Sequence, residues 1–330
     1  MTGNDTGPHP AVRAPVRASR AGGPDAQRAG PGPGPGSGGN GGSGSGRARR
    51  RYRRSRLQRL HEAGPLTYAL LTAVVLASAF PLYWTAVVAS HDNEAVARTP
   101  PPLLPGGSLP ENIRRVFETT DFLLALVNSL IVASAITLSV LVFSSLAGFA
   151  FAKLRFRGRQ ALLMIVIGTM MVPTQLGIIP LYILMGRLGW AGTLPAVVVP
   201  GMVTAFGVFW MRQFISEGVP DELIAAARTD GCHTFRVYWH VVLPAIRPAA
   251  AVLGVFTFMQ AWNDFFWPLV VLTPEDPTVQ VALSTLSAGY FQDYSLILAG
   301  TALATIPVLL VFALLGRQII GGIMAGAVKG

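Results

Sequence analysis

The sequence predicts an all-α membrane protein with six transmembrane helices. Its 330 residues are 51% hydrophobic and only 13% charged, whereas about 25% of the residues of a soluble domain are charged. Six apolar runs approach or exceed the roughly 20 residues that a helix needs to cross the hydrocarbon core of a bilayer. The alternating pattern of a membrane β-barrel is absent from the sequence. The six runs cover residues 66–90, 122–151, 160–185, 193–213, 247–272 and 296–319.

The segment before the first run is expected to be a disordered tail. Residues 1–60 are rich in Gly, Pro and Arg, and residues 1–46 contain almost no large apolar side chain, so burial cannot offset the entropy lost on ordering. Twelve of the 26 Lys and Arg residues lie before residue 60. Such basic runs serve as orientation and lipid-surface signals, so we expect no nucleic-acid partner. Residues 61–330 then form the membrane domain.

The distribution of Lys and Arg predicts that both termini lie in the cytoplasm. Basic residues follow the second run and occupy the connection at 214–246, whereas the connection at 273–295 has acidic residues but no Lys or Arg. Cytoplasmic loops carry the excess of basic residues, so we expect a multi-pass protein of the plasma or inner membrane. A cleavable signal peptide is not expected, because the first run is long and starts far inside the chain. The residues concerned are Lys153, Arg155, Arg157, Arg159, Arg228 and Arg236.

The polar connection at about 214–246 predicts two short helices outside the bilayer. Pro220 suits the first turn of a helix, and the acids that follow it favour the positive end of the helix dipole. Gly231 supplies a left-handed C-cap, Thr234 can cap a second helix, and Pro244 ends it. Three alanines leave a smooth face that another protein can approach closely. From the residues alone, an amphipathic loop resting on the membrane fits equally well.

This connection resembles the EAA coupling loop of permease subunits of ATP-binding-cassette importers. That loop has the form E-A-A, three residues, G, nine residues, I-x-L-P. Ala226 and Ala227 match its alanines, Gly231 matches its glycine, and Leu243 with Pro244 closes the pattern. The resemblance implies a loop that docks on a separate ATPase. Its expected contact residues are Glu222, Ala225, Ala226, Ala227, Asp230, Gly231, Leu243 and Pro244.

The match departs from the family at one position. Ala225 stands where the family usually has Glu, so the charged contact that this Glu makes is missing. Two interpretations stay open: Glu222, one turn earlier, replaces it, or docking relies on shape and on Asp230.

Other segments resemble carbohydrate-importer permeases, in particular the MalG-type subunit of maltose-like systems. They are Asn128-Ser129, residues 262–268 and the terminal residues 321–330. The resemblance covers residues 66–330 and implies the MetI/MalG-like permease fold. It also implies that Lys329 and Gly330 contact the ATPase, with simple fraying as the alternative.

The same resemblance implies the partners and the division of chemistry among them. They are an ATP-binding-cassette ATPase dimer, a second (MalF-like) permease, an extracytoplasmic solute-binding protein, a sugar and membrane lipid. The chain itself is then not an enzyme and holds no cofactor or metal, because the ATPase binds ATP and magnesium. A Gly-x-x-x-x-Gly-Lys-Ser/Thr phosphate loop is absent from the sequence, which agrees with an ATPase on another chain.

Candidate residues for the solute path lie in the fifth run. Asp264 is an acid inside an apolar run, and intramembrane ionisable groups are functional candidates by default. With Trp262 and Asn263 it offers the aromatic face and polar groups that suit a sugar. Two alternatives stay open: Asp264 pairs with a polar group on a neighbouring helix, or it lies near the outer interface with Trp267 in the aromatic belt. In the third run, Pro173 predicts a kinked helix, either lining a cavity or only packing.

The sequence thus predicts the transmembrane permease subunit of an ATP-binding-cassette importer that moves a sugar or oligosaccharide inward by alternating access. A permease for a peptide or an amino acid is the alternative within this class. A secondary carrier would show inverted repeats and intramembrane acids for ion coupling, of which only Asp264 is apparent. A membrane enzyme would need a His/Asp/Glu cluster in the membrane runs, and the sequence has none there.

Overall fold

The computed structural model of the chain describes residues 64–288 and 292–327. The contacts divide the chain into two compact units, residues 1–68 and residues 69–330. The predicted tail at 1–60, Lys329 and Gly330 lie outside the described residues, so the expectations for them stay predictions.

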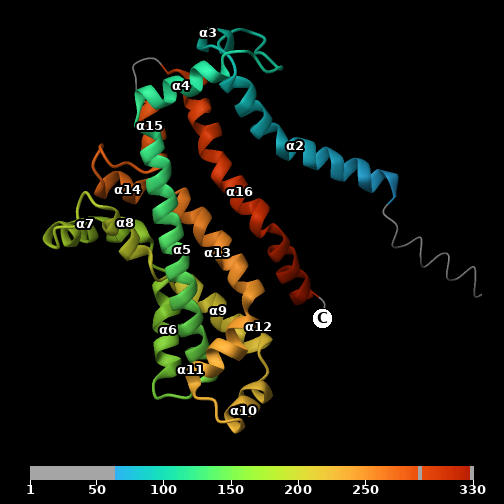
Figure 1. Cartoon of the computed structure of the whole chain (residues 1–330), viewed down its shortest axis with the longest axis vertical. Coiled ribbons are helices and arrows are strands. Elements are labelled where there is room, and N and C mark those ends of the chain that lie inside the picture. Colours follow the sequence, from blue (N-terminus) through green and yellow to red (C-terminus); the bar gives the residue numbers. More distant parts are fainter. Residues whose placement is uncertain (1–63, 289–291, 328–330) are drawn as a thin grey trace, which may run out of the picture. The chain divides into compact units, whose positions relative to one another are not determined.

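All regular structure in the described ranges is helical, as the sequence predicts (Figure 1). In chain order the elements are α2 (Pro65–Ala89), α3 (Asn93–Val96), α4 (Leu109–Thr119), α5 (Phe122–Lys153), α6 (Arg159–Thr169), the 3₁₀ helix η1 (Thr174–Gly177), α7 (Ile178–Arg187), α8 (Leu194–Gly201), α9 (Ala205–Gly218), α10 (Asp221–Thr229), α11 (Thr234–Val237), the π-helical turn η2 (Tyr238–Val242), α12 (Leu243–Ala245), α13 (Arg247–Trp262), α14 (Phe266–Val271), α15 (Val279–Leu286) and α16 (Tyr294–Ala327).

Four segments of the described chain are long and apolar enough to cross a membrane, and two bent pairs bring the number to six if each pair is one span. The four segments are Pro65–Ala89, Phe122–Lys153, Leu194–Gly218, which comprises α8 and α9, and Tyr294–Gly316. The bent pairs are Arg159–Thr169 with Thr174–Arg187, at 91°, and Thr234–Ala245 with Arg247–Trp262, at 77°.

Two predicted runs are interrupted more strongly than the sequence indicates. The third run is broken rather than kinked, because α6 ends at Thr169 and Pro173 follows in a conformation that cannot continue a helix. The fifth run is split, because α13 ends at Trp262 and α14 begins at Phe266. The expectation of one continuous apolar helix over 247–272 is therefore wrong.

Helix α5 is the centre of the bundle and packs along α9 and α13. Its contact with α9 is close because Gly148 has no side chain: a Cβ atom there would lie 2.8 Å from the backbone nitrogen of Arg212 and 2.8 Å from Cβ of Met211. The buried apolar residues form two clusters, one around the C-terminal half of α5 with α9 and the other around its N-terminal half with α15 and α16. Helix α5 therefore links both clusters.

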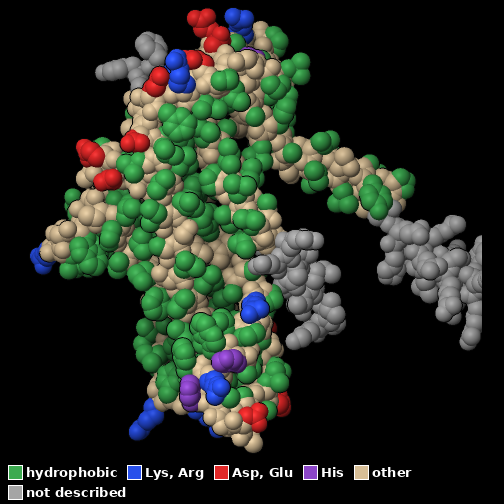
Figure 2. Space-filling model, in the orientation of Figure 1, with side chains coloured by type: hydrophobic (Ala, Val, Ile, Leu, Met, Phe, Trp, Pro, Cys, Tyr) green, Lys and Arg blue, Asp and Glu red, His purple; other side chains and the backbone are tan. Residues whose placement is uncertain are grey.

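Apolar and basic side chains occupy different levels of the molecule (Figure 2). Apolar side chains cover the middle, whereas charged side chains lie mainly at the two ends; basic and His side chains surround α10 and α11 at one end, and the other end carries acidic as well as basic side chains. This distribution agrees with a middle layer in lipid and a basic end in water.

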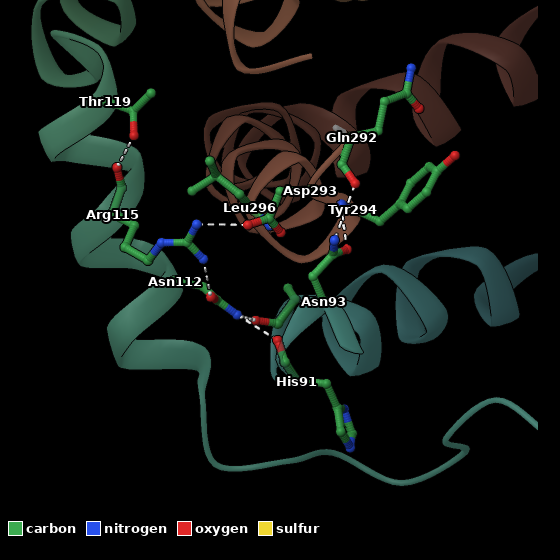
Figure 3. Close-up of polar contacts among 10 residues, drawn as sticks. His91, Asn93, Asn112, Arg115, Thr119, Gln292, Asp293, Tyr294 and Leu296 are labelled. Atoms are coloured by element: carbon green, nitrogen blue, oxygen red, sulfur yellow. Dashed lines mark hydrogen bonds and ion pairs between the residues drawn. The ribbon is translucent and has the colours of Figure 1, made fainter. Parts of the chain in front are cut away.

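The other end of the bundle is fastened by a polar network (Figure 3). Asn112 of α4 donates hydrogen bonds to the carbonyl oxygens of Ala89, at 2.9 Å, and His91, at 2.7 Å. Arg115, one turn further along α4, forms an ion pair of 2.7 Å with Asp293, next to the first residue of α16. These contacts join the segment that follows α2 to α4 and to the start of α16.

The close approach at Gly148 leads to a first prediction. Gly148→Ala should destabilise the protein by about 1 to 3 kcal/mol, the usual cost of overpacking a core. Gly168→Ala, on α6, is the matched control, because a Cβ there meets nothing within 4 Å and alanine favours a helix by up to about 1 kcal/mol. Thermal unfolding of the two purified variants in the same detergent measures both changes in stability. Equal unfolding midpoints for the two variants would contradict the close packing of α5 against α9 at Gly148.

Candidate functional site

The polar connection forms a helix, a glycine turn and a second helical segment, as predicted. Pro220 lies in extended conformation just before α10 rather than inside its first turn. Gly231 has a φ of 80°, which glycine adopts without strain. The amide of Cys232 donates a hydrogen bond of 3.0 Å to the carbonyl oxygen of Ala227 and closes the end of the helix.

The second segment differs from the expectation in one detail. His233 caps α11, since its ring nitrogen accepts a hydrogen bond of 3.2 Å from the amide of Arg236; Thr234 is the first helical residue, so the prediction of a Thr234 cap is wrong. Pro244 is the second residue of the short helix α12, which ends at Ala245, and the chain bends between Ala245 and Arg247. A proline is tolerated there because the first-turn amide has no intrahelical partner.

One face of helix α10 packs against the bundle, and its other face is exposed. Ile224 is buried in the cluster around the C-terminal half of α5. Six of the eight predicted coupling residues are exposed, and the other two are partly buried against the same cluster, which leaves a polar and small-residue face uncovered. The exposed ones are Glu222, Ala225, Ala226, Asp230, Gly231 and Pro244, and the partly buried ones are Ala227 and Leu243.

Three residues on one stripe of α5 hold this unit. Ser145, Phe149 and Lys153 are spaced by four residues and so share one helix face. The hydroxyl groups of Ser145 and Tyr238 lie 2.7 Å apart, and the rings of Phe149 and Tyr238 are 5.8 Å apart between centroids. The amine of Lys153 donates a hydrogen bond of 2.6 Å to the carboxylate of Asp221. The last turns of α5 therefore contact both helical segments of the connection.

The pair of Lys153 and Asp221 lies at the edge of the bundle. The Lys153 side chain is 7% exposed, whereas that of Asp221 is 83% exposed. The hydrogen bond from Lys153 and its positive charge lower the pKa of the Asp221 carboxyl below its ordinary value. Buried lysines are rare unless paired, so Asp221 at the start of α10 supplies the charge that lets Lys153 pack inside.

Sequence reasoning missed this attachment. Lys153 was expected only to set orientation, and Ser145 and Phe149 appear as ordinary residues of an apolar run. Ser145 and Tyr238 are 93 residues apart and Lys153 and Asp221 are 68 apart, so no local pattern pairs them. The four-residue spacing was a usable signal, because it places one hydroxyl, one ring and one charge on a single stripe.

The three candidate path residues do not share one surface. Trp262 is only 2% exposed and stacks on Phe258, with 5.7 Å between ring centroids. Asn263 is exposed, and its side chain donates a hydrogen bond of 2.8 Å to the carbonyl oxygen of Met259. Asp264 is partly buried. A role of Asn263 and Asp264 in the solute path stays a prediction.

The surroundings of Asp264 bear on the two alternatives raised from the sequence. Asp264 lies in the turn between the end of α13 at Trp262 and the start of α14 at Phe266, and within the described residues its carboxylate has no ion-pair partner on a neighbouring helix. Trp267 is buried and donates a hydrogen bond of 3.0 Å to the carbonyl oxygen of Ala196. It is a core residue of the described chain, which argues against the alternative that places it in an interfacial aromatic belt.

The residues Asn128 and Ser129 have a structural role. The Asn128 amide group donates a hydrogen bond of 3.1 Å to the carbonyl oxygen of Pro277. The Ser129 hydroxyl accepts one of 2.8 Å from the amide of Val279, the first residue of α15. Both side chains are buried on α5, and together they satisfy backbone groups of a segment that enters the bundle.

The described chain is a bundle of apolar helices with an attached helical unit, and comparison with known proteins gives its family. Residues 140–320 match the family described as the inner membrane component of binding-protein-dependent transport systems. The chain is 34% identical over 263 residues to the lactose transport system permease protein LacG of Rhizobium radiobacter, covering 79% of this chain and 95% of that protein.

Two further relatives and one solved structure agree. The arabinooligosaccharides transport system permease protein AraQ of Halalkalibacterium halodurans is 35% identical over 204 residues, which is 62% of this chain and 73% of that protein. The sn-glycerol-3-phosphate transport system permease protein UgpE of Pectobacterium atrosepticum is 32% identical over 267 residues, which is 78% of this chain and 95% of that protein. A bacterial ABC transporter involved in the import of the acidic polysaccharide alginate has the same fold, with a TM-score of 0.67 at 22% identity over 76% of this chain and 94% of that one.

This chain belongs to the family of inner membrane components of binding-protein-dependent transport systems. It is a multi-pass membrane permease subunit with the MetI/MalG-like fold. The resemblance noted from the sequence is thereby confirmed.

The Lys153–Asp221 contact leads to a second prediction. Asp221→Asn should speed hydrogen–deuterium exchange of α10 by about two- to fivefold, the modest effect of an exposed ion pair. Because the pKa of Asp221 is depressed, the contact should persist at every pH above the ordinary Asp pKa and weaken only as the pH falls through the depressed value. Glu222→Gln is the control, since Glu222 forms no ion pair within the described chain. Identical exchange of α10 in both variants would exclude this attachment.

Proposed function

We propose that this chain carries a sugar or oligosaccharide inward across the membrane, driven by ATP hydrolysis on a separate chain. The observation that carries the proposal is the attachment of α10. Its open face is available to a partner, while Ile224, Asp221 and Tyr238 hold the helical unit to the end of α5. A push on α10 is thus transmitted to a helix that spans the membrane.

The substrate class rests on the relatives. Lactose, arabino-oligosaccharides and alginate in the names of the proteins above are carbohydrates, and glycerol phosphate is a small polyol ester. A peptide or an amino acid remains the alternative cargo. A secondary carrier has less support, because the family takes its name from transport systems that depend on a binding protein.

The proposed partners follow from surfaces of the described chain. An ATPase dimer would dock on the open face of α10, through shape and through Glu222 and Asp230, because Ala225 offers no charge. A second, MalF-like permease would cover apolar side chains that are exposed on η1, on α7 and in the turn before them, such as Met171, Leu176 and Ile179. An extracytoplasmic solute-binding protein would approach the end fastened by α4. The termini are then cytoplasmic, on the side of the basic end.

The proposed path runs beside the breaks in the third and fifth apolar runs, between α6 and α7 and between α13 and α14. Irregular backbone at membrane depth is tolerated where it is buried in protein or lines a water-filled cavity, and transport proteins use discontinuous helices at their solute sites. Helix α14, which follows the turn at Asp264, packs against α7 and α8 (Figure 1). Asn263 and Asp264 are the residues that we assign to this path.

The proposed mechanism is alternating access. Closure of the ATPase dimer on ATP would carry α10 inward, and α5 would follow because its last turns are bonded to the moving unit. ATP and the loaded binding protein would both favour the outward-open state, since a ligand shifts an equilibrium only by its different affinity for the two states. Magnesium and ATP belong to the ATPase, and the permease contributes no chemical step.

The coupling role leads to a third prediction. Gly231→Val should leave the protein in the membrane but abolish solute uptake, because a β-branched residue at a φ of 80° strains the turn by about 1 to 2 kcal/mol and displaces α10. Gly189→Val is the matched control: Gly189 also has a positive φ, 69°, and open space around it, but lies after α7. Uptake of labelled sugar by cells with equal amounts of each variant measures this. Normal uptake with Gly231→Val, or equal loss with Gly189→Val, would refute the coupling role.

The partners lead to a fourth prediction. Mass spectrometry of what co-purifies with the tagged chain in mild detergent should identify an ATPase, a second permease and a solute-binding protein, and the ligand of the last would identify the cargo. Recovery of the chain alone after crosslinking would instead favour a self-sufficient carrier.

A further inference from the structure

We infer that the chain binds the headgroup of an anionic phospholipid in a basic pocket between the α5–α6 connection and α10. The pocket has a volume of about 1020 Å³. Its wall includes four basic residues and one acid, Asp221. The basic residues are Lys153, Arg155, Arg159 and Arg228.

The charges in this basic pocket do not balance. Lys153 is neutralised by Asp221 at 2.6 Å. Within the part of the chain that the structure describes, Arg155, Arg159 and Arg228 have no carboxylate at ion-pair distance. Three guanidinium groups around one cavity repel one another, so a phosphate group placed among them would be stabilised by charge and by paired N–H donors.

A helix end adds to this positive potential. Helix α6 has 11 residues and begins at Arg159, inside the wall of the basic pocket. Its N-cap is Gly158, and no side chain in the described residues caps it. The first amides of a helix lack intrahelical partners, and together with the helix dipole they favour an anion.

The level of the basic pocket favours a lipid over a soluble anion. Helix α5 has 32 residues, so it is about 48 Å long at 1.5 Å per residue. The hydrocarbon core is only about 30 Å thick, so Lys153 at the end of α5 reaches the headgroup layer. The exposed ring of Phe156 lines the same pocket, and aromatic rings are typical of the membrane interface.

An apolar surface leads from the basic pocket into the membrane. Helix α6 runs from Arg159 towards the bilayer core with the exposed side chains Leu162, Met164 and Ile165. Acyl chains would lie against these residues while the phosphate lies at the first turn of the same helix. Two of the three arginines without an ion pair precede or begin α6, where the Arg159 guanidinium also donates a hydrogen bond of 3.2 Å to the carbonyl oxygen of Leu154. The apolar surface that continues along α6 from these charges fits a lipid better than an acidic segment of the ATPase.

A bound headgroup would bridge the α5–α6 connection and Arg228 of α10. The lipid would then hold the coupling helix from the membrane side, so that anionic lipid stabilises one position of α10. This consequence for transport rests on the proposed function, whereas the lipid site rests on the pocket alone.

The test is native mass spectrometry of the full chain, purified in detergent and mixed with equal amounts of phosphatidylglycerol and phosphatidylcholine. The unmodified chain should retain phosphatidylglycerol in preference. Arg159→Gln and Arg228→Gln should each lower that preference about fivefold, the contribution of one cation near anionic lipid. The two substitutions lie on different elements, so a local disturbance of the α5–α6 connection cannot explain both.

Arg157→Gln is the matched control, because Arg157 is exposed in the same connection but does not line the basic pocket. Its preference should equal that of the unmodified chain. An equal loss with Arg157→Gln, or no preference in the unmodified chain, would overturn the proposal. So would displacement of the lipid by low millimolar inorganic phosphate, or loss of ATPase co-purification in Arg159→Gln with lipid retention unchanged.

Lipid retention is measured without transport. A failure of this test therefore leaves the coupling role of α10 in place, and a failure of the Gly231→Val test leaves the lipid site in place.

Discussion

The packing of α5 against its neighbours is the contact on which the rest of the structure depends. Residues of this helix lie in both buried clusters, and Gly148 allows α9 to pack closely against it. Asn128 and Ser129 near its start bind the segment before α15, whereas Ser145 and Lys153 near its end contact the helical segments α10 to α12, the proposed coupling unit. A single helix thus carries fixed contacts at both levels of the membrane.

Much of the fold follows from the sequence because the bilayer restricts the choices. A backbone in lipid must satisfy its own hydrogen bonds, so long apolar runs can only be helices. The local chemistry of the coupling unit was also readable: acids start α10 and a glycine ends it. The sequence is less decisive where two neighbouring residues can play the same role. Both His233 and Thr234 can accept a capping hydrogen bond, and only the path of the chain decides which one does.

The interruptions and the polar contacts were harder to anticipate. Pro173 indicates a bend, but its angle depends on what α7 packs against, which a linear pattern does not contain. Asp264 is an unusual acid in an apolar run, and its place in the break between α13 and α14 becomes apparent only in the folded chain. The contacts of Lys153 and Ser145 join residues that are 68 and 93 positions apart. Such pairs depend on tertiary arrangement, which local propensity does not determine.

The contact between Lys153 and Asp221 affects whether the α10–α12 segment can be exchanged between related permeases. The coupling unit occupies one continuous stretch of sequence, yet part of its binding site belongs to a helix that ends 68 positions earlier. A chimera that received this stretch from a relative would inherit the face that we propose for the ATPase but not the residues of α5 that hold it. The unit of exchange between related permeases is therefore the loop together with the last turns of α5, two segments that must be inherited as one.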